Sequence, residues 1–375
     1  MKNTFGNSIS ITLFGESHGE EIGVVLDGFA PGIEVDEAYI AQKLALRRPI
    51  GKISTGRVEP DHFRIVSGVF EGHTTGTPIC VLIPNENVRS RDYESTRFLA
   101  RPGHADYAAF CKYGGYEDYR GGGHFSGRLT APLVAAGAIA QLALEKKGIR
   151  IGTHIARCAG IADRGFEHLE SDIEALAGRA FAVLDESIGV KIQSAIEQAA
   201  ADGDSVGGVL ETAVTGLPAG VGEPWFDSLE SALSHALFSI PALKGVEFGD
   251  GFAMADMRGS EANDGFAMSG DEAGDSSAAR GGAIVTKTNH NGGINGGISN
   301  GMPILFRCAV KPTPSIYKEQ DTVDFLRRQK EKLQISGRHD PAIVHRIRVV
   351  ADSVTALVLC DMLALRYGTD YLREV

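Results

Sequence analysis

The sequence places three histidines in short glycine-rich stretches that are too polar to be core. His18 lies in FGESHG, His104 in RPGHAD and His124 in RGGGHFSG. A single histidine in a loop is more often a surface residue than a catalyst, but three such loops favour a shared site. Imidazole can protonate a leaving group near neutral pH, and glycine lets the backbone approach a ligand. For FGESHG three interpretations stay open: an ordinary turn, a Ser17 nucleophile or a His18 acid.

Basic residues gather in similar short stretches, although the chain carries a formal net charge of −11. The clusters contain Arg47, Arg48 and Lys52 in LRRPIGK, Arg128 in HFSGR, Arg338 in SGRHDP and Lys311 in KPTPS. Cationic pockets on an acidic protein favour a small polyanion, such as a phosphate with carboxylates, because guanidinium groups match both. The first cluster also has a plainer interpretation, since cations are favoured at the C-terminus of any helix.

Composition and missing motifs exclude several classes of protein. An acidic chain is a poor prospect for non-specific binding to nucleic acid. The five cysteines are scattered and form no CxxC pair, which indicates a reduced cytosolic protein without a zinc site. The N-terminal MKNTFGNSIS lacks the apolar run of a signal peptide. The sequence contains no P-loop, no GxSxG elbow, no HExxH and no strand–GxGxxG–helix pattern.

Hydrophobic periodicity predicts a mixture of strands and helices. Strands are expected at 7–14, RIVSGVF, TPICVLI, GGVLETAVTGL, GAIVTKT and PILFRCAV. Helices are expected at 35–48 with Asp36 as N-cap, from Pro132 to near Gly148, and at 186–203, 227–240, 322–334 and 353–368. The apolar stretch 131–144 is too short to span a bilayer and is interpreted as a buried helix. Because strands and helices do not alternate strictly, we expect an α+β fold.

Residues 245–297 form the most unusual segment of the chain. They are crowded with Gly, Asp, Asn and Ser and show little apolar periodicity. So long a structureless stretch in a compact protein is usually functional or mobile, with a disordered insertion as the alternative. The chain shows no linker and no convincing internal repeat.

Taken together, the motifs resemble those of the chorismate synthase family. The matching stretches are FGESHG (14–19), LRRP (46–49), SGVFEGHTTGTPI (67–79), RSRDY (89–93), RPGHADY (101–107), DYRGGG (118–123), GDSVGG (203–208), GEPWFD (222–227), GGINGGISNG (292–301), KPTPSI (311–316) and GRHDP (337–341). They span the chain, and FGESHG, RPGHAD and GRHDP in this order and at these distances are highly specific.

The resemblance implies one domain over residues 1–375, a β-α-β sandwich in which helices lie between antiparallel sheets. It implies a phosphate-eliminating lyase that converts 5-enolpyruvylshikimate 3-phosphate into chorismate by 1,4-trans elimination. Phosphate would leave C3 and a proton would leave C6, with reduced FMN required and no net redox change. This reaction is the last common step of the shikimate pathway to the aromatic amino acids. A cytoplasmic homotetramer without nucleic-acid, membrane or metal partners is expected.

The resemblance also implies roles for individual residues. His18 would protonate the departing phosphate, His104 would help to protonate reduced FMN, and Asp340 would relay a proton from flavin N5. The implied substrate-binding residues are Ser17, Arg47, Arg48, Lys52 and Arg128. The implied FMN-contacting residues are His124, Phe125, Ser126, Pro241, Ala242, Gly296, Lys311, Pro312, Thr313, Pro314, Ser315 and Arg338. Segment 245–297 would then be a loop that FMN binding orders.

The chain departs from the family pattern in places, and two other functions stay open. Many bacterial members read RSSARET where this chain reads HFSGRLT, and Pro241 stands where asparagine is common. One alternative is a phosphatase with His18 as nucleophile, which would leave a hydroxyl group on C3. The other is a non-catalytic binder of a phosphorylated metabolite. Some family members also reduce FMN with NADPH, but no added reductase module is visible, which favours an external supply of reduced FMN.

Overall fold

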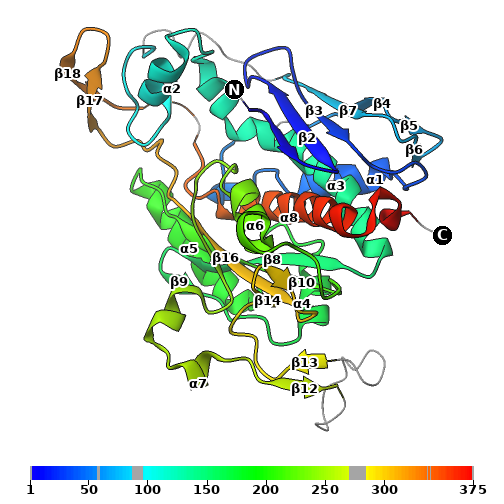
Figure 1. Ribbon diagram of the computed structural model, residues 1–375. Helices are drawn as coiled ribbons and strands as arrows, with labels where there is room; N and C mark the ends of the chain where they lie inside the picture. The colour runs from blue at the N-terminus through cyan, green and yellow to red at the C-terminus, as the bar shows by residue number, and fades with distance from the viewer. Residues whose placement is uncertain are drawn as a thin grey trace.

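Two five-stranded antiparallel sheets enclose a layer of helices in this computed structural model, which describes residues 2–56, 60–86, 96–269, 284–335, 337 and 339–373. In Figure 1, helix α8 runs through the middle of the molecule, with one sheet above it and the other below. The prediction of an α+β fold with helices between antiparallel sheets is therefore confirmed.

The first sheet has the strand order β1-β2-β3-β7-β4. Its strands are β1 (Thr4–Gly6), β2 (Ser10–Gly15), β3 (Glu21–Asp27), β4 (Arg64–Ser67) and β7 (Ile79–Pro84). A small hairpin of β5 (Val69–Phe70) and β6 (His73–Thr74) follows β4. Alternate residues of β7 are buried, which is the pattern of a strand with one face on the core. Because β2 ends at Gly15, the FGESHG turn lies at the edge where β2 passes into β3.

The second sheet has the order β11-β16-β10-β8-β9. Its strands are β8 (Arg150–Cys158), β9 (Ile161–Ala162), β10 (Gly208–Thr215), β11 (Leu243–Phe248) and β16 (Ile304–Val310). In the centre of this sheet, β10 pairs with β16 on one side and with β8 on the other. The chain leaves β16 at Val310 and enters the KPTPS segment directly, so this sheet positions that motif.

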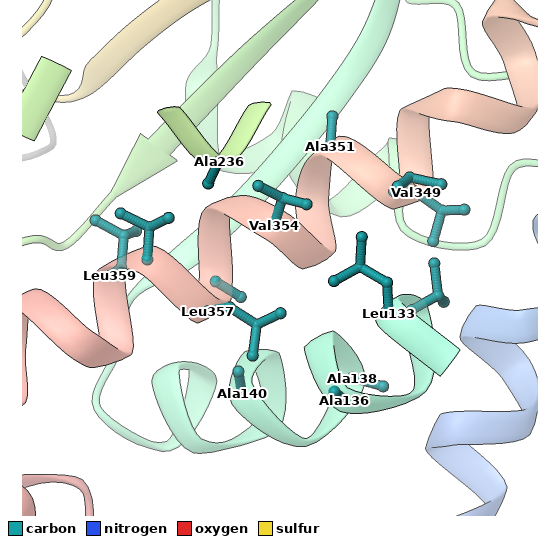
Figure 2. Close-up of a cluster of buried hydrophobic side chains, with 14 of the residues drawn as sticks. Leu133, Ala136, Ala138, Ala140, Ala236, Val349, Ala351, Val354, Leu357 and Leu359 are labelled. Carbon is teal, nitrogen blue, oxygen red and sulfur yellow. The ribbon is translucent and has the colours of Figure 1, made fainter. Parts of the chain in front are cut away.

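Helices α3 (Thr130–Lys146) and α8 (Val344–Tyr367) form the centre of the layer between the sheets. They approach closely because α3 is rich in alanine and glycine: a Cβ atom added at Gly137 would lie 2.2 Å from Ser353 Cβ. Figure 2 shows the two helices side by side, with Ala140 pointing toward Leu357. The helical run Gly127–Lys146 is longer than the predicted apolar stretch and apolar enough to cross a membrane. Its most apolar window is nevertheless 78% buried inside the protein, as expected of a core helix.

The remaining described helices lie elsewhere in the fold. They are α1 (Glu37–Ala45), α2 (Asp106–Tyr113), α4 (Leu169–Leu176), α5 (Glu186–Ala201), α6 (Leu229–Leu237) and the short α7 (Gly259–Ala262). Of these, α1 packs against α3 and α6 against α8. The predicted N-cap of α1 is confirmed, because the Asp36 carboxylate accepts hydrogen bonds from the backbone of Ala38 and Tyr39. Helix α1 ends at Ala45, so Arg47 and Arg48 lie in the turn that follows it.

The predicted helix at 322–334 is wrong, because these residues form a hairpin of β17 (Gln320–Asp324) and β18 (Gln329–Leu333). Asp324 Oδ1 accepts hydrogen bonds from the backbone of Leu326 and Arg327, which closes the turn. The hairpin edge also pairs with the segment before RPGHAD, where Ala100 N donates to Val323 O at 3.1 Å. A long-range backbone partner therefore outweighed the local helix propensity of this charged sequence.

The expectation of a structureless segment at 245–297 is wrong for most of its described residues. Besides the end of β11 and helix α7, it contains the hairpin of β12 (Phe266–Met268) with β13 (Ile284–Thr286). It also contains β14 (Ile294–Asn295), which pairs with β15 (Ile298–Ser299) just beyond the segment. Asp264 organises part of it by accepting hydrogen bonds from the backbone of His290 and Asn291. Residues 270–283 of the segment lie outside the described part of the chain.

Candidate active site

A cavity of about 1020 Å³ opens beside the N-terminal half of α8. Apolar side chains of three elements form part of its wall: Ile11 and Leu13 of β2, Ala236 at the end of α6, and Ile347, Val350, Val354 and Leu357 of α8. The described lining residues include nine lysines and arginines against five aspartates and glutamates. Because the whole chain carries a net charge of −11, this excess of cations marks a site for an anion.

The FGESHG turn lies behind one wall of the cavity. Ser17 and His18 are only 2% and 7% exposed, and Ser17 Oγ lies 3.2 Å from His18 Nδ1, within hydrogen-bond distance. The Ser17 backbone amide donates to Gly123 O at 3.1 Å. The side chain of His124 completes the connection, since its Nδ1 donates to Gly15 O at 2.8 Å. The turn is therefore bound to the RGGGHF segment at Gly15 and at Ser17, the residue before His18.

The glycine turn that lines the cavity leaves no room for a side chain beside His18. Gly121 has a φ of +59°, and a Cβ atom there would lie 1.9 Å from His18 Cε1. Gly121 and Gly122 line the cavity, whereas His18 does not. The imidazole thus packs directly against the backbone that forms the cavity wall. Only glycine permits both the positive φ and this close contact.

Two arginines from distant parts of the sequence meet at one carboxylate. Arg47 Nη1 donates to Asp61 Oδ2 at 2.8 Å, and Arg128 Nη1 pairs with Asp61 Oδ1. The side chains of all three residues are less than 10% exposed. Arg48 reaches the same turn, where its Nη2 donates to Pro60 O at 3.0 Å. The substrate-binding arginines predicted in LRRP and HFSGR therefore lie together in the structure.

Further hydrogen bonds join these arginines to the other motifs. Arg128 Nε donates to Asn85 Oδ1 at 3.0 Å, and Asn85 Nδ2 donates to Gly19 O at 2.9 Å in the FGESHG turn. On the other side, Arg346 Nε donates to Arg47 O at 2.7 Å. Its Nη1 pairs with Asp340 Oδ2 at 2.6 Å. One continuous network thus connects FGESHG, LRRP, HFSGR and GRHDP.

The RPGHAD loop forms another part of the cavity wall. His104 Nε2 is hydrogen-bonded to Ser315 Oγ at 2.8 Å, and Lys311 Nζ donates to Gly103 O at 2.7 Å. Burial, together with the positive charges of Arg101 and Lys311, lowers the pKa of His104 to about 4. His104 is therefore neutral at neutral pH in the ligand-free chain.

The structure brings most of the predicted site residues to this one cavity. Those that line it are Arg47, Arg48, His104, His124, Phe125, Ser126, Arg128, Pro241, Ala242, Lys311, Pro314, Ser315 and Asp340. Those that do not are Ser17, His18, Lys52, Gly296, Pro312 and Thr313. Gly296 lies in the exposed turn between β14 and β15, and Arg338 lies outside the described residues.

Sequence reasoning missed three residues that organise the site: Asp61, Asn85 and Arg346. Each is polar and lies beside a recognised motif or a strand end, which is a weak signal on its own. Their importance comes from partners that are distant in sequence, such as Arg128 for Asp61 and Arg47 for Arg346. No local pattern could have identified these pairs.

Comparison with known proteins agrees with the motifs. The family model described as chorismate synthase matches residues 9–364. The chain is 47% identical to the chorismate synthase of Pyrococcus abyssi over 361 residues, which are 96% of this chain and 97% of that protein. It is 45% identical to the chorismate synthase of Chitinophaga pinensis over 97% of each chain. A solved crystal structure of chorismate synthase superposes with a TM-score of 0.73 at 26% identity, covering 97% of this chain and 94% of that one. The chain therefore belongs to the chorismate synthase family and is a lyase.

Proposed function

We propose that this enzyme eliminates phosphate from 5-enolpyruvylshikimate 3-phosphate in a 1,4-trans reaction that yields chorismate and depends on reduced FMN. Phosphate leaves C3 and a proton leaves C6, with no net redox change. One observation carries the proposal. Residues from LRRP, RPGHAD, DYRGGG, HFSGR, KPTPS and GRHDP line a single cation-rich cavity, and His18 of FGESHG packs against its wall. A substrate with a phosphate and two carboxylates suits such a lining.

The residues of the cavity fit a flavin phosphate together with this substrate. Pockets for one drug-sized ligand hold roughly 300–1,000 Å³, so about 1020 Å³ leaves room for two neighbouring small molecules. The aliphatic side chains of α8 offer an apolar surface for a planar ring system, and the surrounding arginines and lysines suit phosphate groups. When bound, reduced FMN would supply electron density for cleavage of the C–O bond and a basic atom for the C6 proton.

His18 is the proposed acid for the departing phosphate. Its ring orientation is restricted by Ser17 Oγ, at 3.2 Å from Nδ1, and by the contact with Gly121. Because Gly121 lines the cavity, a phosphate group seated against the glycine turn would lie close to this ring. A buried acid is shielded from water and can deliver its proton to the leaving group.

His104 and Asp340 are proposed to transfer protons to and from the bound flavin. His104 is neutral in the ligand-free chain, so it must gain a proton before it can act as an acid. An anion bound near Arg101 and Lys311 would offset their positive charge and raise the pKa of His104. Asp340 accepts hydrogen bonds from Thr55 N at 2.8 Å and from Arg346. As a relay, it would take up the incoming proton on a remaining lone pair of one of these two oxygens.

The remaining predicted residues are proposed to bind the two ligands. For the substrate these are Ser17, Arg47, Arg48, Lys52 and Arg128. For FMN these are His124, Phe125, Ser126, Pro241, Ala242, Gly296, Lys311, Pro312, Thr313, Pro314, Ser315 and Arg338. The residues of this set that line the cavity support these assignments directly.

A homotetrameric assembly is proposed as well, with the whole chain as one domain in each subunit. Gly296 lies in an exposed turn and is not part of the cavity lining. Its neighbour Gly297 packs against Glu223 and Ser228, which flank Trp225 and Phe226. These two aromatic side chains are 84% and 91% exposed, as expected of residues that a second subunit covers. In such an assembly, Gly296 of one subunit would lie close to the flavin of its neighbour.

Cytoplasmic location and an external supply of reduced FMN are part of the same proposal.

An anaerobic assay tests the reaction. The enzyme is incubated with reduced FMN and the enolpyruvyl substrate, while phosphate release and chorismate absorbance are followed together. Equal amounts of both products are expected. Phosphate without chorismate would indicate a phosphatase, and neither product would indicate a binding protein. NADPH oxidation in the presence of oxidised FMN is expected to be negligible, since no added reductase module is visible in the sequence.

A further inference from the structure

The turn of Pro60 and Asp61 has a backbone geometry that is unusual for a residue with a side chain. Asp61 has a φ of +51° and is only 6% exposed. Aspartate tolerates this left-handed region better than most residues, but the conformation still costs free energy. Such strain persists where the surroundings fix the conformation, and it occurs often at functional sites. Asp61 also lines the cavity.

The Asp61 carboxylate divides its two oxygens between two arginines. Oδ2 accepts from Arg47 at 2.8 Å, and Oδ1 accepts from Arg128. Other donors of each guanidinium reach neutral partners on the protein. Arg47 Nε donates to Thr130 Oγ1 at 3.1 Å, and Arg128 Nη2 donates to Pro84 O at 3.1 Å. Both side chains are therefore held in defined orientations before a ligand arrives.

Two buried guanidinium groups side by side repel each other, and each is costly to remove from water. A carboxylate between them offsets this cost in the ligand-free protein. The other lining aspartates have simpler contacts, because Asp106, Asp118 and Asp340 are each shown in an ion pair with one arginine. Among the described carboxylates that line the cavity, Asp61 is therefore the one that links arginines from two separate motifs.

We propose that Asp61 is a positioning residue, whose carboxylate holds Arg47 and Arg128 in the orientation in which they bind the anionic substrate. Preorganised donors bind an anion without first paying the entropy of being ordered. The substrate's identity rests on the function proposed above, but the geometric statement concerns only this chain's own residues. Asp61 itself need not touch the substrate.

The test measures substrate binding apart from turnover. Titration calorimetry with 5-enolpyruvylshikimate 3-phosphate in the absence of flavin gives Kd, and the anaerobic assay gives KM and kcat. In Asp61→Asn, we expect Kd and KM to rise about 10- to 100-fold, because a charge-assisted contact that holds each arginine is lost. The value of kcat should change by less than about fivefold, since saturating substrate restores the arrangement.

The matched control is Asp172→Asn. Asp172 is also 6% exposed and pairs with Arg164, but it lies in α4 away from the cavity. This variant should lose stability while its Kd and KM remain those of the wild type. If Asp172→Asn raised Kd as much as Asp61→Asn, a general loss of stability would explain both, and the proposal would be wrong.

The outcomes separate this proposal from the proposed function. An unchanged Kd in Asp61→Asn would overturn the positioning role, and so would tighter binding, which would show that Asp61 only reduces the local positive charge. Failure of the wild type to form chorismate would overturn the function and leave the binding comparison valid. If Asp61→Asn does not fold, Asp61→Glu keeps the charge but displaces the carboxylate. An increase in its Kd at an unchanged Tm supports the proposal, and an unchanged Kd contradicts it.

Discussion

The FGESHG turn and the RPGHAD loop each carry a proposed catalytic histidine, but the surroundings of the two imidazole rings differ. His18 is buried behind a glycine turn, and its neighbourhood is fixed by backbone hydrogen bonds from Ser17 and to Gly15. His104 lines the cavity and lies near Arg101 and Lys311. Steric contact therefore determines the position of the first ring, whereas burial and positive charge determine the protonation of the second.

This difference allows the position of the His18 ring and the pKa of His104 to be set independently within one site. The position of His18 depends on the absence of a side chain at Gly121, which no charge in the cavity alters. The pKa of His104 depends in part on cations that a bound anion would neutralise. Ligand binding should thus change the protonation of His104 much more than the position of His18.

Replacement of His18 should have the largest effect. In His18→Ala, we expect turnover to fall by about 10²–10⁴-fold, because the leaving phosphate loses its acid. Binding of FMN should change little. Phosphate release and flavin fluorescence measure the two quantities. His73→Ala, at an exposed histidine outside the cavity lining, is the control and should keep wild-type values. Turnover close to that of the wild type in His18→Ala would remove His18 from this role.

Gly121→Ala tests whether steric contact places the His18 ring. The added Cβ atom would collide with the imidazole, so we expect turnover to fall by about 10²-fold, as a displacement of about 1 Å can produce. The positive φ adds a loss of stability of about 1–3 kcal/mol. Steady-state kinetics and urea unfolding check the two effects.

Gly127→Ala is the matched control for this substitution. Gly127 also lines the cavity, but a Cβ atom there would meet nothing within 4 Å. Its turnover and stability should remain near those of the wild type. Equal losses in the two variants would show that the cavity wall tolerates no added methyl group anywhere, and the special contact with His18 would lose its support.

The smallest expected effect is a pH dependence of stability that comes from His104. Its pKa is about 4 in the folded chain and about 6.5 when unfolded, so above pH 6.5 it is neutral in both states. As the pH falls from 6.5 toward 4, the unfolded state binds the proton first and folding becomes less favourable. The wild type should therefore lose up to about 3 kcal/mol more than His104→Gln between pH 7 and pH 4.

Urea unfolding of both proteins at several pH values measures this difference. The buried His345, whose pKa is lowered to about 3, contributes equally to both proteins and cancels. Identical pH profiles would show that His104 is not held neutral in the fold. The contrast between the two loops would then disappear.

Several elements were predictable because their cause is local. The N-cap at Asp36, the alternating pattern of β7 and the apolar run of α3 each depend on neighbouring residues. The hairpin at 320–333 was not predictable from its charged sequence, since the pairing of Val323 with Ala100 decided it. In the same way, Asp264 gives structure to a segment whose composition indicated none.

The sequence by itself determined the family, the proposed chemistry and most residues of the candidate site, because residues such as His18, Arg48, His104 and Asp340 lie in short motifs whose spacing is specific. Only the tertiary structure decided that Asp61 joins Arg47 to Arg128 and that His18 lies behind Gly121. The physical reason is the range of the interactions. A motif depends on residues that are neighbours in the sequence. A shared carboxylate or a steric contact between distant segments exists only after the sheets and helices have packed.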